Sequence, residues 1–169
     1  MRRYILLFFL TIHLLGCNKD PDSLFDMPYE LNFEVAAGLN TFEAHYFDIS
    51  GIRTNAEDLL NANNVQDTDI TAVQPKTARL LSTFADVDLD FIREISIRVF
   101  EDDPDAFHEI FFRDNVPLNS EDFIDLIPAL PDVKEFLLDD GYNISIRMEF
   151  RLPPPTFVTM RLDYDFFAQ

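Results

Sequence analysis

The sequence predicts a mainly β protein, an antiparallel β-sandwich of about eight strands with two short helices. Most segments alternate apolar and polar residues with a period of two, the pattern of strands that have one face in water. Only two short stretches carry helix signals, and no solenoid-type repeat is present. The alternation argues against a parallel α/β sheet, and a small up-and-down barrel is the nearest alternative.

Eight segments show strand patterns, and apolar residues on both faces of the second predict an interior position for it. The strands are predicted over residues 29–35, 41–49, 77–84, 87–99, 107–113, 123–127, 142–152 and 158–166. The fourth is long, with a bulge between Phe91 and Arg93. The last two show the strongest alternation, and a linker of three prolines (153–155) joins them, so we expect them to form a hairpin.

Two segments have helix punctuation. Thr54 with Glu57 fits a capping box that opens a helix over residues 56–62. Pro131 suits the first turn of a second helix with its body at residues 134–138, and Gly141 stands where a C-terminal cap belongs.

The charge of the chain is strongly negative. There are 31 acidic and 13 basic residues, a net charge of −18. A field of this sign repels nucleic acid, so we expect no nucleic-acid partner. It favours solubility and attraction of cations or basic partners. The 18 Phe can supply a hydrophobic core without disulfides, since the chain has 1 Cys.

The first 17 residues look like an export signal. Arg2 and Arg3 precede an apolar run over residues 4–15, which is too short to span a bilayer well. The run ends in Leu14-Leu15-Gly16-Cys17, which resembles the lipobox of bacterial lipoproteins. An uncleaved anchor or a buried N-terminal strand is the alternative.

The lipobox resemblance implies a signal peptide at residues 1–16, a lipidated tether at 17–28 that begins at Cys17, and one β-sandwich domain at 29–169. It implies attachment to the membrane through lipid, such as palmitate, on Cys17, and a location in the bacterial cell envelope at the outer membrane. Whether the domain faces the periplasm or the cell surface stays open, as does its protein or envelope-polymer ligand.

The function expected on this basis is a lipid-anchored envelope domain that binds or scaffolds and is not an enzyme. The alternatives are a carrier of an apolar ligand and a hydrolase that uses a carboxylate pair. No motif for nucleophilic catalysis, phosphate binding or dinucleotide binding is present. His45 and His108 both fall in predicted strands, where a structural role is expected.

Calcium is the one cofactor that the sequence suggests. An acidic turn between the fourth and fifth strands offers four hard oxygen ligands, from Glu101, Asp102, Asp103 and Asp105. Residues 86–90 resemble the start of an EF-hand loop, but Phe91 and Ile97 replace the required Gly and Glu.

Overall fold

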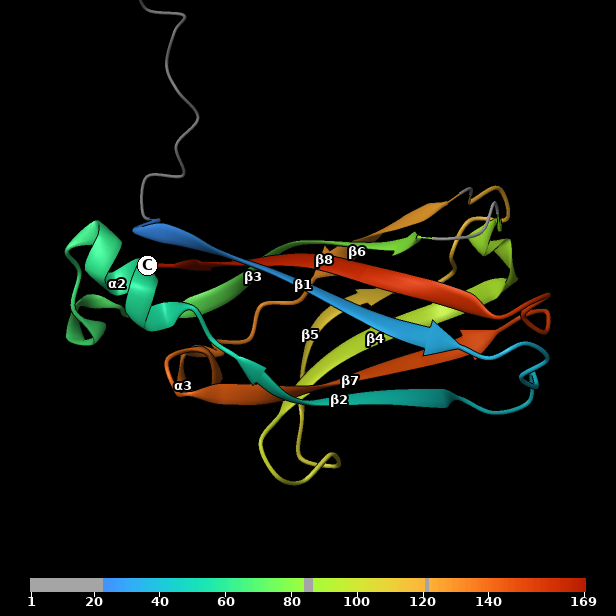
Figure 1. Cartoon of the computed structure of the whole chain (residues 1–169), viewed down its shortest axis with the longest axis horizontal. Coiled ribbons are helices and arrows are strands. Elements are labelled where there is room, and N and C mark those ends of the chain that lie inside the picture. Colours follow the sequence, from blue (N-terminus) through green and yellow to red (C-terminus); the bar gives the residue numbers. More distant parts are fainter. Residues whose placement is uncertain (1–22, 84–86, 121) are drawn as a thin grey trace, which may run out of the picture.

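The computed structural model describes residues 23–83, 87–120 and 122–169, and Figure 1 shows two facing layers of strands. The strands are β1 (Phe25–Val35), β2 (His45–Arg53), β3 (Val73–Ser82), β4 (Ile92–Phe100), β5 (His108–Arg113), β6 (Phe123–Pro128), β7 (Gly141–Phe150) and β8 (Val158–Ala168). The helices are α2 (Ala56–Asn63) and α3 (Lys134–Leu137), with 3-10 turns at Asp67–Asp69 and Leu89–Phe91.

The strand order is β1-β8-β3-β6-β5-β4-β7-β2, and every pairing is antiparallel. Two residue pairs between β5 and β6 join a β1-β8-β3-β6 half to a β5-β4-β7-β2 half. Within each half, strands from the first part of the chain (β1–β4) alternate with strands from the second part (β5–β8). This is the topology of a jelly roll. The predicted mainly β, antiparallel sandwich with two short helices is therefore confirmed.

The edge strands β1 and β2 nearly close the sandwich. The rings of Phe33 on β1 and Phe47 on β2 lie 5.4 Å apart across this seam. The second strand, expected in the interior, is thus an edge strand. Its inward side packs Phe47 and Ile49 against the core, while Tyr46 on its outer side is 56% exposed.

The core lies between the two halves and follows the alternation in the sequence. In β8 every second residue from Val158 to Ala168 is buried, and the residues between them face outward. Strand β8 lies between β1 and β3, so its buried side chains lie at the centre of the inward face of that half. Ring contacts such as Phe111–Phe166, at 6.0 Å, connect the layers.

The expected hairpin of the last two strands is wrong. Strand β7 pairs with β2 and β4, whereas β8 pairs with β1 and β3, so the two strands lie in opposite halves. Three successive prolines have fixed φ angles and lack N–H donors, which is unsuited to a tight hairpin turn. The residues between β7 and β8 instead cross from one layer to the other. Packed sheets lie about 10 Å apart, and the connection spans this distance.

Several strand boundaries also differ from the prediction. Strand β2, predicted over residues 41–49, is His45–Arg53. Strand β1 begins at Phe25, so it includes the end of the predicted tether. The expected long fourth strand is a 3-10 turn at Leu89–Phe91 followed by β4. Strand β3 begins at Val73 and tolerates Pro75, because the β3–β8 register shifts between Pro75 and Thr77.

The helix signals are correct in place and wrong in detail. Asn55 is the N-cap of α2 and forms no side-chain capping bond, while the Thr54 hydroxyl donates to the Asp139 carbonyl at 2.7 Å. The predicted capping box is therefore absent. Gly141 is not a helix cap: it begins β7, where a Cβ would lie 2.9 Å from the Ile52 carbonyl oxygen.

Candidate functional site

The outward face of the β1-β8-β3-β6 half is the most acidic ordered surface on the described strands. Its side chains come from the exposed positions that alternate with the buried core positions. The acids are Asp26, Glu30, Glu34, Asp125, Asp163 and Asp165, and the bases are Lys76, Arg79 and Arg161. We call these nine residues the acidic face.

Strand register aligns four charged residues of the acidic face in one row. Glu30 of β1 is opposite Asp163 of β8, and Asp163 is also opposite Arg79 of β3. Arg79 is in turn opposite Asp125 of β6. Directly opposed side chains on neighbouring strands lie about 4.5–5.5 Å apart at Cβ, so the Glu30–Asp163 pair is a destabilising contact of like charges.

Two carboxylates of this row, Asp125 and Asp163, already have a cationic partner. Arg79 Nε lies 2.6 Å from Asp125 Oδ1, and Arg161 Nη2 lies 2.9 Å from Asp163 Oδ2. The hydrogen bond to Asp125 raises the pKa of Arg79, and the charge of Asp163 adds to this. Among the described residues no cation lies within ion-pair distance of the Glu30 carboxylate.

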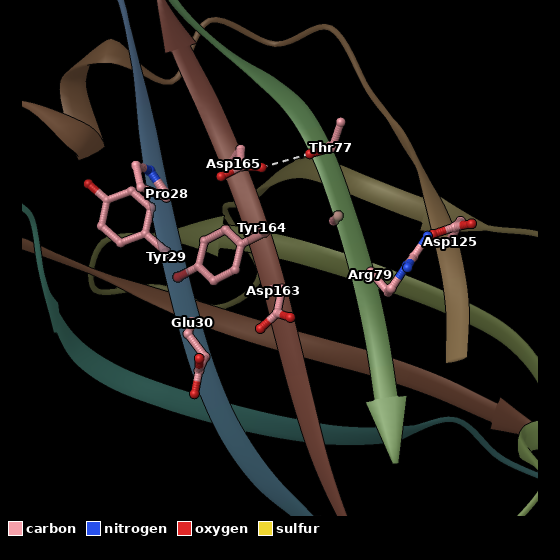
Figure 2. Close-up of a pocket in the computed structure, with 10 residues that line it drawn as sticks. Pro28, Tyr29, Glu30, Thr77, Arg79, Asp125, Asp163, Tyr164 and Asp165 are labelled. Carbon is pink, nitrogen blue, oxygen red and sulfur yellow. Dashed lines mark hydrogen bonds and ion pairs between the residues drawn. The ribbon is translucent and has the colours of Figure 1, made fainter. Parts of the chain in front are cut away.

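An open hollow of about 680 Å³ lies along this row. Figure 2 shows Glu30 and Asp163 on neighbouring strands, with Arg79 turned toward Asp125 and Asp165 held by Thr77. The Thr77 hydroxyl donates to Asp165 Oδ2 at 2.8 Å. Four of the ten residues that line the hollow are acids: Glu30, Asp125, Asp163 and Asp165. Residues of β3 orient the side chains of Asp125 and Asp165.

Tyrosine rings support the hollow from below. The Tyr142 and Tyr164 hydroxyls share a buried hydrogen bond of 2.8 Å. Tyr29 stacks on Tyr164 with ring centroids 5.5 Å apart and meets Tyr142 edge-on at 5.8 Å. Burial raises the pKa of all three phenols, that of Tyr29 to about 12. These rings are neutral at physiological pH and hold β1 and β8 rigidly in place.

The residues of the predicted calcium turn lie elsewhere. Glu101, Asp102, Asp103 and Asp105 are all exposed on the β4–β5 connection, and the Asp103 carboxylate accepts the Asp105 N–H at 3.0 Å. Within residues 23–83, 87–120 and 122–169 no group of three or more His, Cys, Asp or Glu side chains is arranged to hold a metal ion. The calcium site thus stays a prediction. Cys17 lies outside the described residues.

The two histidines of the described chain have structural surroundings. His45 Nε2 is 2.9 Å from the Asn40 carbonyl oxygen, and its ring lies 5.2 Å from that of Phe150. The His108 ring contacts that of Phe136 at 5.5 Å.

The acidic face was missed by reading the sequence alone. The alternation places Glu30, Asp163 and Asp165 outward, and the net charge indicates an acidic surface. The register that sets Glu30 opposite Asp163 joins residues far apart in the chain, and no local pattern encodes it. The one indication in the sequence was that the segment at residues 158–166, one of the two with the strongest alternation, carries two acids at outward positions.

Comparison with known proteins finds solved structures of low similarity. No family model matches the chain, and no curated protein matches it. A similar solved structure is the BFDV capsid protein, solved as a decamer, with 12% identity, a TM-score of 0.35, and coverage of 86% of this chain and 98% of that chain. Desmodium yellow mottle tymovirus has 14% identity, a TM-score of 0.30, and coverage of 86% and 87%. The empty head of turnip yellow mosaic virus has 10% identity, a TM-score of 0.25, and coverage of 92% and 86%.

These values are too low to transfer a function. They do correct the lipobox resemblance: no lipoprotein family or curated relative matches, and the similar structures come from viruses. The prediction of a bacterial lipoprotein that carries palmitate is wrong. The expected location in the cell envelope stays a prediction. The resemblance covered four residues, too few to identify a family.

The expected lipid-anchored envelope function and its alternatives are wrong with it. In the described core Phe91 packs on Phe150 with ring centroids 5.8 Å apart, and the buried polar side chains are Ser96, Ser120 and Ser145. No helix in this part of the chain has the length and apolar character needed to cross a membrane.

Proposed function

We propose that this chain is a protein-docking module that acts by binding, without catalysis, and that its acidic face holds a positively charged extended segment of a partner protein. The observation that supports this most strongly is the Glu30–Asp163 pair, two carboxylates opposed on adjacent strands. Arg161 pairs with Asp163, and among the described residues no cation pairs with Glu30. A lysine or arginine side chain placed between them would relieve their repulsion. The proposal therefore explains a local arrangement that costs the free protein stability.

The shape of the site favours a polypeptide over a metal ion. The row crosses four strands and holds three carboxylates and Arg79, whereas a divalent ion needs its oxygens converging on one point at about 2–2.6 Å. An open hollow of about 680 Å³ instead accommodates several side chains of an extended segment. The net charge of −18 would attract such a segment at a distance and would repel nucleic acid.

A direct test uses a fluorescein-labelled octalysine peptide and fluorescence anisotropy at about 50 mM salt. Removal of both opposed charges, Glu30→Gln with Asp163→Asn, should weaken binding about tenfold or more, because the peptide loses two of its closest counter-charges. The same peptide should bind the native chain more weakly as salt rises.

The control removes the same total charge elsewhere, with Asp48→Asn on β2 and Asp102→Asn on the β4–β5 connection. Both residues are exposed, and neither belongs to the acidic face. This pair should change the affinity by less than about twofold, which is the size of a diffuse charge effect. Equal losses in the two double variants would contradict the proposal, because only overall charge would then matter.

A further inference from the structure

Two connections at one end of the sandwich expose large apolar side chains, while the neighbouring connections at that end carry acids, Asp88, Asp90, Asp114 and Asp122. Phe42, in the β1–β2 connection, is 96% exposed, and Leu152 and Phe157, in the β7–β8 connection, are 56% and 51% exposed. The two connections adjoin, since the Gly38 N–H donates to the Pro154 carbonyl at 2.9 Å. In Figure 1 they lie at the right-hand end of the sandwich, away from both helices. We call residues 36–44 and 151–157 the apolar tip.

The charge of the apolar tip differs from that of the rest of the chain. Its charged residues are one acid, Glu43, and one base, Arg151, so the tip has no net charge in a chain of −18. The Glu43 carboxylate accepts a hydrogen bond from Asn40 Nδ2 at 2.6 Å, and the Arg151 guanidinium donates to the Val116 carbonyl. Neither charge projects freely beside Phe42.

Phe42 is presented by an ordered turn. The Asn40 side-chain oxygen accepts the N–H of Phe42 at 3.0 Å and that of Glu43 at 3.2 Å. The Asn40 carbonyl also lies 2.9 Å from His45 Nε2, at the start of β2. Four contacts to one asparagine thus hold the turn in a shape that leaves a phenylalanine in water, an unfavourable exposure unless something covers it.

We infer that the apolar tip inserts into an electrically neutral lipid surface, such as the interface of a phosphatidylcholine bilayer. Side chains that project singly from two turns enter a fluid interface without a complementary pocket, and Phe and Leu are the residue types that gain by this transfer. A lipid surface that has no net charge would not repel the acidic body that carries the tip. Anionic lipid would repel that body.

A second copy of the chain is a weaker occupant. Stable interfaces bury about 800 Å² on each partner, usually around a packed and contiguous patch. Three side chains on two turns provide only a fraction of this. This inference does not depend on the proposed function, because it uses none of the residues of the acidic face.

The absence of tryptophan from the chain makes the test specific. In the full chain, Phe42→Trp introduces a single indole at the tip, and Leu130→Trp introduces one at the opposite end, where Leu130 is 81% exposed. With phosphatidylcholine vesicles, the Phe42→Trp emission should shift to the blue and be quenched by brominated lipid. The Leu130→Trp emission should not change. The apolar run near the N-terminus is common to both variants, so it cannot produce the difference.

Vesicle sedimentation gives the size of the effect. Phe42→Ser should lower the partition coefficient of the chain about tenfold, whereas Leu130→Ser should leave it unchanged. Replacing part of the phosphatidylcholine with phosphatidylserine should weaken binding at low salt. The inference is overturned if Phe42→Trp emission is insensitive to vesicles, or if Phe42→Ser and Leu130→Ser partition equally. It is also overturned if the emission shifts with protein concentration alone, which would identify a second copy as the occupant.

Discussion

Tyr29 differs from the two tyrosines that it contacts. The Tyr142 and Tyr164 hydroxyls satisfy each other, whereas the Tyr29 hydroxyl is buried without a hydrogen-bond partner. Burial raises the pKa of Tyr29 to about 12, and the nearby backbone N–H of Asn55 opposes this shift without reaching hydrogen-bond geometry. An unpaired buried hydroxyl costs free energy that a phenylalanine ring would not.

Tyr29→Phe should therefore leave the free energy of unfolding at pH 7 unchanged or higher. It should also reduce the loss of stability in alkali. A tyrosine in the unfolded chain ionises near pH 10. The folded chain keeps Tyr29 protonated until about pH 12, so stability is fully present below pH 10 and falls as pH rises toward 12. Denaturant titrations at pH 7, 10 and 11 measure both effects.

Tyr142→Phe is the matched control, since it removes a hydroxyl that does have a partner. It should cost about 1 kcal/mol at pH 7, because the Tyr164 hydroxyl is left unpaired in the core. If Tyr29→Phe costs as much as Tyr142→Phe, the distinction between the paired and unpaired hydroxyls is incorrect.

At the scale of elements, alternation located the strands and turn residues located the helices. The inward positions of β8, from Val158 to Ala168, follow from its sequence pattern and are all buried. Asn64, with a φ of 53°, caps the C-terminus of α2, close to the predicted helix end at residue 62. These features could be predicted because each depends on residues within a few positions of one another.

Strand partners could not be predicted in the same way. Alternation indicates which face of a strand is buried, but not which strand lies beside it. The predicted pairing of β7 with β8 is therefore wrong, and each is a central strand of a different half. The same limit applies to the candidate site. Glu30 and Asp163 are 133 positions apart, and only the β1–β8 register brings them together. Their individual exposure was predictable, and their opposition was not.

Glu30→Gln should stabilise the chain by about 0.2–1 kcal/mol, because it removes one of two like charges on facing strands. The gain should shrink as salt rises, since both carboxylates are near water. Glu34→Gln is the matched control: Glu34 is also on β1 but lies opposite Thr159, so its loss relieves no direct repulsion. Thermal unfolding at about 20 mM and 500 mM salt provides the comparison. A gain for Glu34→Gln as large as that for Glu30→Gln would show that only net charge matters.

At the scale of the whole molecule the two outer faces have different electrostatics. On the β5-β4-β7-β2 half, Arg147 pairs with Glu94 at 2.6 Å and also with Glu149. Hydrogen bonding to Arg93 lowers the pKa of Glu149, and neighbouring Arg147 contributes. Opposite charges are thus matched on that face, and the unmatched negative charge of the described strands gathers on the acidic face.

Because of this asymmetry, a cationic partner would gain the most binding free energy at the acidic face. The apolar tip lies at one end and shares no residues with that face. The jelly roll produces this arrangement: four antiparallel strands align the charged row, and two connections at one end form the tip. Binding on one face and contact at one end could therefore occur together without competing for residues.

The most direct test of the docking proposal is residue-resolved. Unlabelled octalysine would be titrated into the isotopically labelled chain, and amide chemical-shift changes would be followed by NMR. We expect the largest changes at Glu30, Asp163, Asp165 and their strand neighbours, with little change on β2, β4 and β7. Changes spread evenly over all exposed acids, or centred on the β5-β4-β7-β2 half, would contradict the proposal that the acidic face is the docking site.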